Sequence, residues 1–493
     1  MNKYILCTTA LLLAGLSAFA QDSLESVAQP PVQVAKKTVP APGLTLDECQ
    51  QLALHNNRTL QKARFDIRMA DEDAAIAFTK YFPSVQAGVT GFIGAKDLMR
   101  TTMDMTGFGQ TYGPALMQAG LGELLMGMPP QNDISMMKKG VVGNVVAMQP
   151  LYAGGQIVTG NKLAALQQEV RRLQCAMSEK DILLSVAEYY WQIVGLRSNV
   201  LTLDAVDEQL SIIHTLTSNY VKAGIINRND LLTVELKQQE MASARLQVNN
   251  ALELLRLVLA QLCGADVGDF EVANPVQNLA AVGSAEGAWI DGLPRPNEVF
   301  VSPGDAVYSR EELELAGKNV EAKALEVKME QGKNLPSVAL GAAGLYQGID
   351  MGTMSVKNGG SMYNMNIGNL VGLATVSIPI SDWWGGKHAV RKARLAQQQA
   401  ENDRQDALER LQIDIISSWN NLTEAYAQIG IAQKSVTSAT ENLRLNREQY
   451  AAGTQPISDL MDAVTLFTRA NNDLSNAFAT YQSRLSEYLR KTR

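Results

Sequence analysis

The chain has few of the side chains that most enzymes and metal proteins use. Its 493 residues include only three histidines, which are far apart (His55, His214 and His388). No zinc-protease, serine-hydrolase or nucleotide-binding motif is present. The only close carboxylate pair tied to a motif, Asp459 and Asp462, has no nucleophile or metal ligand beside it. We therefore expect no enzymatic activity, no metal site and no cofactor.

Cysteine is also scarce. Cys7 lies inside a predicted secretion signal, which leaves Cys49, Cys175 and Cys263 in the mature chain. An odd number of cysteines with no paired spacing argues against a disulfide framework and against zinc binding. We interpret all three as buried free thiols.

Neither an excess of positive charge nor a long apolar run is present. The net charge is -7 and the pI is about 5.3, which offers no basic surface for nucleic acid. No run of 18 or more apolar residues follows the signal segment, so the sequence predicts no transmembrane helix.

Proline is missing from three long windows, which predict uninterrupted helices. The windows are Pro150 to Pro275, Pro379 to Pro456, and the segment after Pro456. Apolar residues recur within them at spacings of three and four, as in Leu203, Val206, Leu210, Ile213, Leu216 and Tyr220.

These helices are expected to be rods that fold back on themselves. A helix from Gln156 to Lys222 would be about 100 Å long at roughly 1.5 Å per residue. Gly224 and Gly453 are expected to end the long helices, because glycine readily takes the left-handed conformation that follows a helix. The sequence thus predicts helical hairpins at 156–262 and 387–493.

The chain also repeats itself. Three pairs share a spacing of 229 residues: Pro150 and Pro379, Gly224 and Gly453, and Asp230 and Asp459. A repeat of this length is too long for a solenoid unit and indicates one architecture built from two similar halves. We divide the chain into a signal peptide (1–20), a flexible tether (21–43), a first repeat (44–262), a linker (263–308) and a second repeat (309–493).

Four segments of about ten residues have strand character. They are 84–94, 141–150, 337–346 and 371–380, and each half contributes two. About ten residues is the length that a tilted strand needs to cross a bilayer. The intervening segments 95–140 and 347–369 are expected to be loops. Because about eight strands are needed to close a barrel, the chain must oligomerise.

Glycine pairs follow the second strand of each half. They are Gly154 with Gly155, and Gly385 with Gly386. We expect both pairs to form the turns that connect strand to helix.

The combined order of elements resembles the TolC family of outer-membrane efflux proteins. A signal peptide precedes two copies of helix, strand pair, long helix, G-x5-D-L turn and helix, and the resemblance covers Leu44 to Arg493. It implies a fold that is mainly α with membrane β: a homotrimer with a twelve-stranded β-barrel, four strands per chain, continued by a long periplasmic α-helical barrel.

The resemblance also implies a function and partners. The chain would be a passive exit duct in the outer membrane, in contact with outer-membrane lipid and driven by an inner-membrane pump through a periplasmic adaptor protein. Two alternatives stay open: a periplasmic adaptor, and a trimeric coiled-coil surface protein.

The segment from Tyr450 to Asp462 matches the part of the family at the periplasmic mouth of the tunnel. The resemblance implies that Asp459 and Asp462 form an acidic ring and that Tyr450 faces Asp230. Gln455 stands where a family member has an arginine, which puts a salt-bridged latch in doubt. Alternatively, Asp230 and Asp459 serve only as helix caps.

Methionine is concentrated in the two expected loops, which hold twelve of the 19 methionines. Thioethers suit Cu(I), but methionine is also a flexible packing residue. We favour the packing interpretation.

Overall fold

The computed structural model describes residues 43–93, 95, 99–104, 110–111, 114–115, 117–118, 131–136, 139–266, 270–273, 293–353, 362–381 and 383–493. The predicted signal peptide, and the predicted tether apart from Gly43, lie outside these residues. Most of the predicted linker does as well.

The described chain opens with two helices, α2 (Leu46–Asn56) and α3 (Arg58–Thr79). Thr45 and Glu48 form a capping box at the start of α2, because each side chain accepts a hydrogen bond from the other residue's main-chain N–H. The Asn57 side chain accepts from the N–H groups of Thr59 and Leu60 and so caps α3. The two caps fix where the chain enters the fold.

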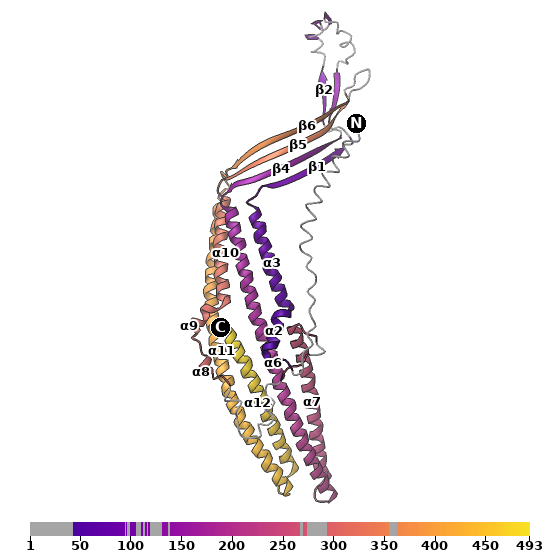
Figure 1. Ribbon diagram of the computed structural model, residues 1–493, viewed down its shortest axis with the longest axis vertical. Helices are drawn as coiled ribbons and strands as arrows, with labels where there is room; N and C mark the ends of the chain where they lie inside the picture. Colours follow the sequence, from indigo (N-terminus) through magenta and orange to yellow (C-terminus); the bar gives the residue numbers. More distant parts are fainter. Residues whose placement is uncertain are drawn as a thin grey trace.

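Four long helices form the body of the molecule (Figure 1). The helices α6 (Gln156–Lys222) and α11 (Gly385–Ala451) have 67 residues each, and α7 (Arg228–Cys263) and α12 (Ile457–Thr492) have 36 each. A helix of this greater length measures about 100 Å. The remaining helical segments are α8 (Pro296–Val299), α9 (Pro303–Ala306), η3 (Val307–Ser309) and α10 (Glu311–Lys333). None of the helices in the described part of the chain combines the length and apolar character needed to span a bilayer.

One antiparallel sheet caps the helices. Its order is β1-β4-β5-β6, and its strands are β1 (Ser84–Ile93), β4 (Lys139–Ala153), β5 (Ser337–Thr353) and β6 (Met362–Ser377). The strands of the two halves meet where β4 pairs with β5. A separate hairpin pairs β2 (Met99–Asp104) with β3 (Gln131–Met136).

The strands differ in length from those predicted. The segments 95–140 and 347–369 are not simply loops, because β2 and β3 lie in the first, and β5 and β6 extend into the second. Glycine content misled the prediction, although glycine fits where a cross-strand neighbour is bulky: a Cβ on Gly140 would meet the Phe92 ring. At the other end, β6 stops at Ser377, just before Pro379, which cannot donate to a ladder.

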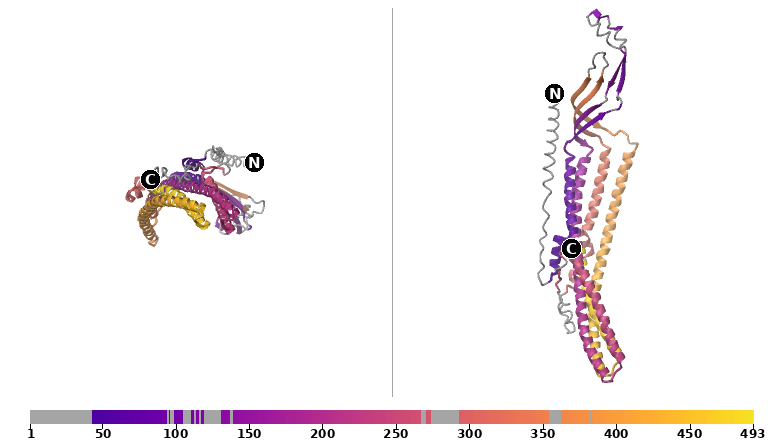
Figure 2. Two further views of the ribbon diagram at one scale, coloured as in Figure 1. Left: turned by 90° about the horizontal axis from the view of Figure 1, so that it is seen from below. Right: turned by 90° about the vertical axis from the view of Figure 1, so that its right-hand side faces the viewer.

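The helices pack into an arc rather than a closed bundle (Figure 2, left). The largest buried cluster lies halfway along the long helices and contains Tyr190 of α6 with Phe478, Tyr481 and Tyr488 of α12. The predicted fold class is therefore confirmed for one chain: mainly helical, with four sheet strands and two similar halves.

Candidate functional site

The two hairpin tips lie together at the end of the molecule farthest from the sheet (Figure 1). Gly224 follows α6 with φ +68°, and Gly453 follows α11 with φ +72°. Gly224 donates to the carbonyl of Val221, and Gly453 donates to that of Tyr450. These paired turns retain the spacing of 229 residues seen in the sequence, and both glycines take the left-handed conformation that ends a helix.

Tyr450 connects the two tips. It is buried, and its hydroxyl lies 3.0 Å from the Thr217 hydroxyl of α6. A second hydrogen bond joins the two hairpins, because the Tyr220 hydroxyl donates to the carbonyl of Ala451 at 3.0 Å. Burial raises the pKa of Tyr450, and the nearby Asp230 carboxylate raises it further, whereas the Thr217 hydrogen bond lowers it. Tyr450 therefore remains a neutral hydrogen-bonding group at neutral pH.

An apolar cluster supports this connection. Around Tyr450 it joins residues of both hairpins: Val206, Leu210, Ile213, Val234, Ile457, Leu460, Met461 and Val464. The cluster therefore packs the two hairpins against each other near their tips.

Asp230 and Asp459 occupy the first turns of the two returning helices, and Asp462 lies in the second turn of α12. Asp230 is the third residue of α7 and is half-buried, whereas Asp459 is the third residue of α12 and is exposed, as is Asp462. The N-cap residues are Asn227 and Pro456, so neither Asp230 nor Asp459 is the N-cap. Both still lie at the positive end of a helix dipole.

Gln455 and Thr217 also lie at the tip. Gln455 is half-buried, and its side-chain oxygen has no hydrogen-bond partner among the described residues. Thr217, the hydroxyl partner of Tyr450, was not predicted. Its spacing could have revealed it. Thr217 lies four residues after Ile213 and three before Tyr220, so it continues the buried stripe in which the sequence analysis placed Leu216.

The turns between sheet and helices differ in the two halves. Gly154 and Gly155 have φ of +61° and +76° before α6, as predicted for a turn. In the second half, Trp383 and Trp384 take the positive φ, at +45° and +70°, whereas Gly385 and Gly386 are the first residues of α11. A Cβ on Gly386 would overlap the Asn334 side chain, which would have to move.

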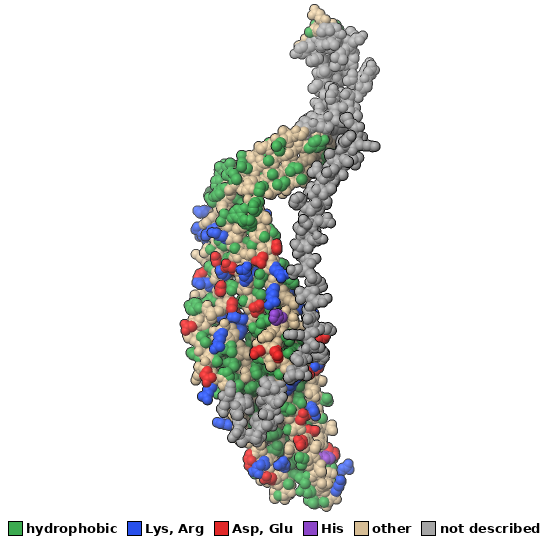
Figure 3. Space-filling model, in the orientation of Figure 1, with side chains coloured by type: hydrophobic (Ala, Val, Ile, Leu, Met, Phe, Trp, Pro, Cys, Tyr) green, Lys and Arg blue, Asp and Glu red, His purple; other side chains and the backbone are tan. Residues whose placement is uncertain are grey.

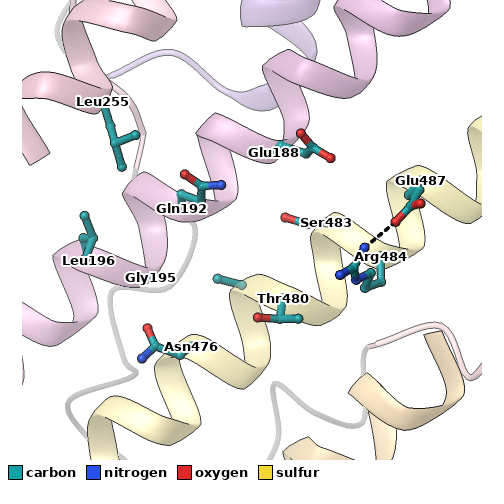
Figure 4. A pocket seen from close by; sticks show the side chains of 11 residues that line it. Glu188, Gln192, Gly195, Leu196, Leu255, Asn476, Thr480, Ser483, Arg484 and Glu487 are labelled. Atoms are coloured by element: carbon teal, nitrogen blue, oxygen red, sulfur yellow. Dashed lines mark hydrogen bonds and ion pairs between the residues drawn. The ribbon is translucent and has the colours of Figure 1, made fainter. Parts of the chain in front are cut away.

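A pocket of about 460 Å³ lies between α6 and α12. Its walls combine polar and apolar residues, and Figure 4 shows Glu188 facing the ion pair of Arg484 with Glu487. Burial and the Glu487 charge raise the pKa of Glu188, and Arg484 lowers it. Among the described residues, no group of three or more His, Cys, Asp or Glu side chains is placed to hold a metal ion.

Comparison with known proteins connects this geometry to a family. The model of the "Outer membrane efflux protein" family matches residues 303–487. The Escherichia coli (strain K12) outer membrane protein TolC is 28% identical over 159 residues, which are 32% of this chain and 32% of TolC. The resemblance to the TolC family is confirmed.

Solved structures share the fold over nearly the whole chain. The Campylobacter jejuni CmeC outer membrane channel superposes with a TM-score of 0.67 and 15% identity, over 91% of this chain and 85% of CmeC. A membrane protein from Pseudomonas aeruginosa gives a TM-score of 0.67 and 14% identity, over 91% and 93%. The predicted outer-membrane location is confirmed by the family match and by the similarity to TolC. The matched family is one of efflux channels, not of enzymes.

Proposed function

We propose that the protein is the outer-membrane exit duct of a tripartite export system. Three copies would complete a twelve-stranded barrel, and the long helices would continue it as a tunnel into the periplasm. The observation that carries this proposal is the single four-stranded sheet whose two outer strands, β1 and β6, are edges. Open strand edges are not tolerated in hydrocarbon, so the edges must pair with those of neighbouring copies.

The strand register supports a lipid-facing surface. Residues directly opposite each other in antiparallel strands share a face, and the register places one set of exposed apolar side chains on the same face of all four strands. The set is Val85, Val89, Ile93, Val141, Val145, Leu340, Tyr346, Leu370 and Val376. We call this set the apolar sheet face. An exposed apolar surface of this extent suits lipid rather than water.

The opposite face is the more polar one, although Leu345 and Leu373 are also exposed on it. The register places Gln86, Thr90 and Asn144 there, together with Asn369 and Thr375. Figure 3 likewise shows charged side chains over the helices and uncharged ones over the sheet. In a closed barrel this polar face would line the lumen, which is the arrangement of a water-filled channel.

The arc of helices supports the tunnel. Three arcs placed around one axis would leave the centre open, and the two repeats would supply equivalent walls. The adaptor and the pump are inferred from the family: a passive duct has no energy source of its own, so transport has to be driven from the inner membrane.

The proposal predicts opposite results for two neighbouring residues. Val89 is 78% exposed on the apolar sheet face, and Thr90 lies on the other face. Val89→Arg would place a charge in lipid at a cost of about 2–4 kcal/mol, so trimers should be lost from the outer membrane. Thr90→Arg should assemble and change the conductance instead.

The measurement is the amount of heat-sensitive trimer in outer-membrane fractions, followed by single-channel recording in planar bilayers. If Val89→Arg assembled as well as Thr90→Arg, the assignment of faces would be wrong. A wild-type protein that purified as a monomer without detergent would overturn the proposal as a whole.

A further inference from the structure

Two cysteines that lie 214 positions apart in the chain are neighbours in the fold. Cys49 lies in α2, and Cys263 is the last residue of α7. Both are 0% exposed, and the Cys263 thiol donates to the main-chain oxygen of Cys49 at 3.4 Å. The hydrogen bond with the Cys49 side chain, burial and the Cys49 charge all raise the pKa of Cys263. The Cys263 thiol therefore contacts the main chain of Cys49 within a buried apolar cluster.

The first described residues of the chain pack next to this cysteine pair. The Asn57 amide donates to the carbonyl of Leu262 at 2.8 Å, next to Cys263. The main-chain N–H of Leu44 donates to Glu271, and Ala273 donates back to Leu44, both at 2.8 Å. The entering segment 44–57 is thus held against residues 262–266 and 270–273 on either side of the cysteine pair.

Apolar packing and hydrogen bonds both hold the entering segment. Leu44 and Ala53 lie in one buried cluster with Phe270 and Val272, and each of the hydrogen bonds above contributes about 1 kcal/mol. A covalent link at the centre of the contact would fix the segment against loss. A link across so long a loop also restricts the unfolded chain strongly.

We propose that Cys49 and Cys263 form a disulfide bond in the exported protein. The inference rests on the proposed periplasmic position of the helices, since disulfides form and persist in oxidising compartments. The sequence argued against it because three cysteines leave one unpaired. In the structure all three cysteines are buried free thiols, as the sequence predicted. Cys175, on α6, is the one that the proposal leaves unpaired, because the side chains that affect its pKa are Glu179 and Arg64 rather than a second cysteine.

The reaction needs a donor protein with an exchangeable disulfide. The thiolate of one cysteine attacks the donor disulfide and forms a mixed disulfide, while one donor sulfur leaves as a thiolate and takes a proton. The other cysteine then attacks the mixed disulfide, forms the Cys49–Cys263 bond and releases the second donor sulfur as a thiol. Two electrons and two protons pass to the donor. Because both cysteines are fully buried in the fold, the exchange precedes docking of α2.

The first test uses the unmodified protein. Outer membranes are prepared without reductant, free thiols are blocked with an alkylating reagent under denaturing conditions, and the protein is digested and mapped by mass spectrometry. We expect one cross-linked peptide containing Cys49 and Cys263, with the Cys175 peptide alkylated. Alkylation of Cys49 and Cys263 in protein taken from the outer membrane would overturn the inference and leave the proposed function intact. Absence of the protein from the outer membrane would instead contradict the proposed function.

A second test measures what the bond does. Reductant should lower the temperature at which the wild-type trimer dissociates on a gel. Cys49→Ala and Cys263→Ala should both abolish this reductant-dependent shift, whereas Cys175→Ala, the matched removal of a buried thiol, should retain it. An equal reductant-dependent shift in Cys49→Ala and the wild type would contradict the inference.

Discussion

At the scale of single residues, the most constrained charges lie where α10 begins. The Arg310 guanidinium donates two hydrogen bonds to Glu312, both of 2.9 Å, and Arg490 of α12 donates a third at 3.0 Å. Arg310 is only 8% exposed. Burial alone would raise the pKa of Glu312, but these hydrogen bonds and charges outweigh it and lower the pKa to about 2. The carboxylate therefore joins the short helices to the C-terminal helix in its charged form.

Glu312→Gln should destabilise the protein in a pH-dependent way. Because the folded-state pKa is depressed, the charge contributes stability above the unfolded value near 4.5, and this contribution is lost as the pH falls toward 2. We expect a loss of about 2–3 kcal/mol at pH 7. Thermal denaturation as a function of pH measures it, and the gap between variant and wild type should narrow below pH of about 4.5.

Glu314→Gln provides the matched control. Glu314 lies on the exposed face of the same first turn of α10, so its substitution should change stability by less than about 0.5 kcal/mol. Equal effects of the two substitutions would show that the Glu312 contacts contribute nothing beyond those of an ordinary surface carboxylate.

At the scale of elements, the sequence predicted the helices better than the strands. Proline-free windows and three-four spacing are local signals, and they located both long hairpins. Strand ends depend instead on cross-strand partners: β5 continues to Thr353 because β6 pairs with it as far as Met362. The turn before α11 was predicted at Gly385 and Gly386, but it lies at the two residues before them. Trp383 and Trp384 take left-handed conformations that sequence rules reserve for glycine.

The junction between sheet and helices provides a second prediction. Gly154 and Gly155 both have positive φ, but a Cβ on Gly154 would overlap the carbonyl oxygen of Gly332 at the end of α10, whereas a Cβ on Gly155 would meet nothing within 4 Å. Gly155→Ala should therefore cost about 1–2 kcal/mol from backbone conformation alone. Gly154→Ala should cost clearly more, because α10 must also move.

The midpoint of thermal dissociation of the trimer distinguishes the two variants. Comparable shifts would mean that α10 does not press against the turn. Such a result would contradict the close contact between Gly154 and the carbonyl oxygen of Gly332.

At the scale of the whole molecule, the repeat was readable from the sequence, but the contacts between its copies were not. A spacing of 229 residues located equivalent turns, yet it could not show that the Tyr450 hydroxyl would meet Thr217, or that Cys263 would meet Cys49. Such contacts depend on how helices from distant segments rotate against each other. Periodicity places a residue on a face and leaves open which residue it meets across the interface.

The acidic tip provides the last prediction. Asp459 and Asp462 are exposed on one side of α12, while Leu460, Met461 and Ala463 between and after them are buried. In a trimer around one axis, three copies of each carboxylate would converge at the tunnel mouth, where rings of carboxylates attract cations. Asp459→Asn combined with Asp462→Asn removes these charges with little change in shape. We expect weaker cation selectivity and a several-fold weaker block by multivalent cations in planar bilayers.

Asp473→Asn is the control. Asp473 is an exposed aspartate farther along the same helix, and its substitution should leave both properties unchanged. If the double variant matched the Asp473 control, the two aspartates would lie outside the ion path, and their influence would be limited to the helix dipole of α12.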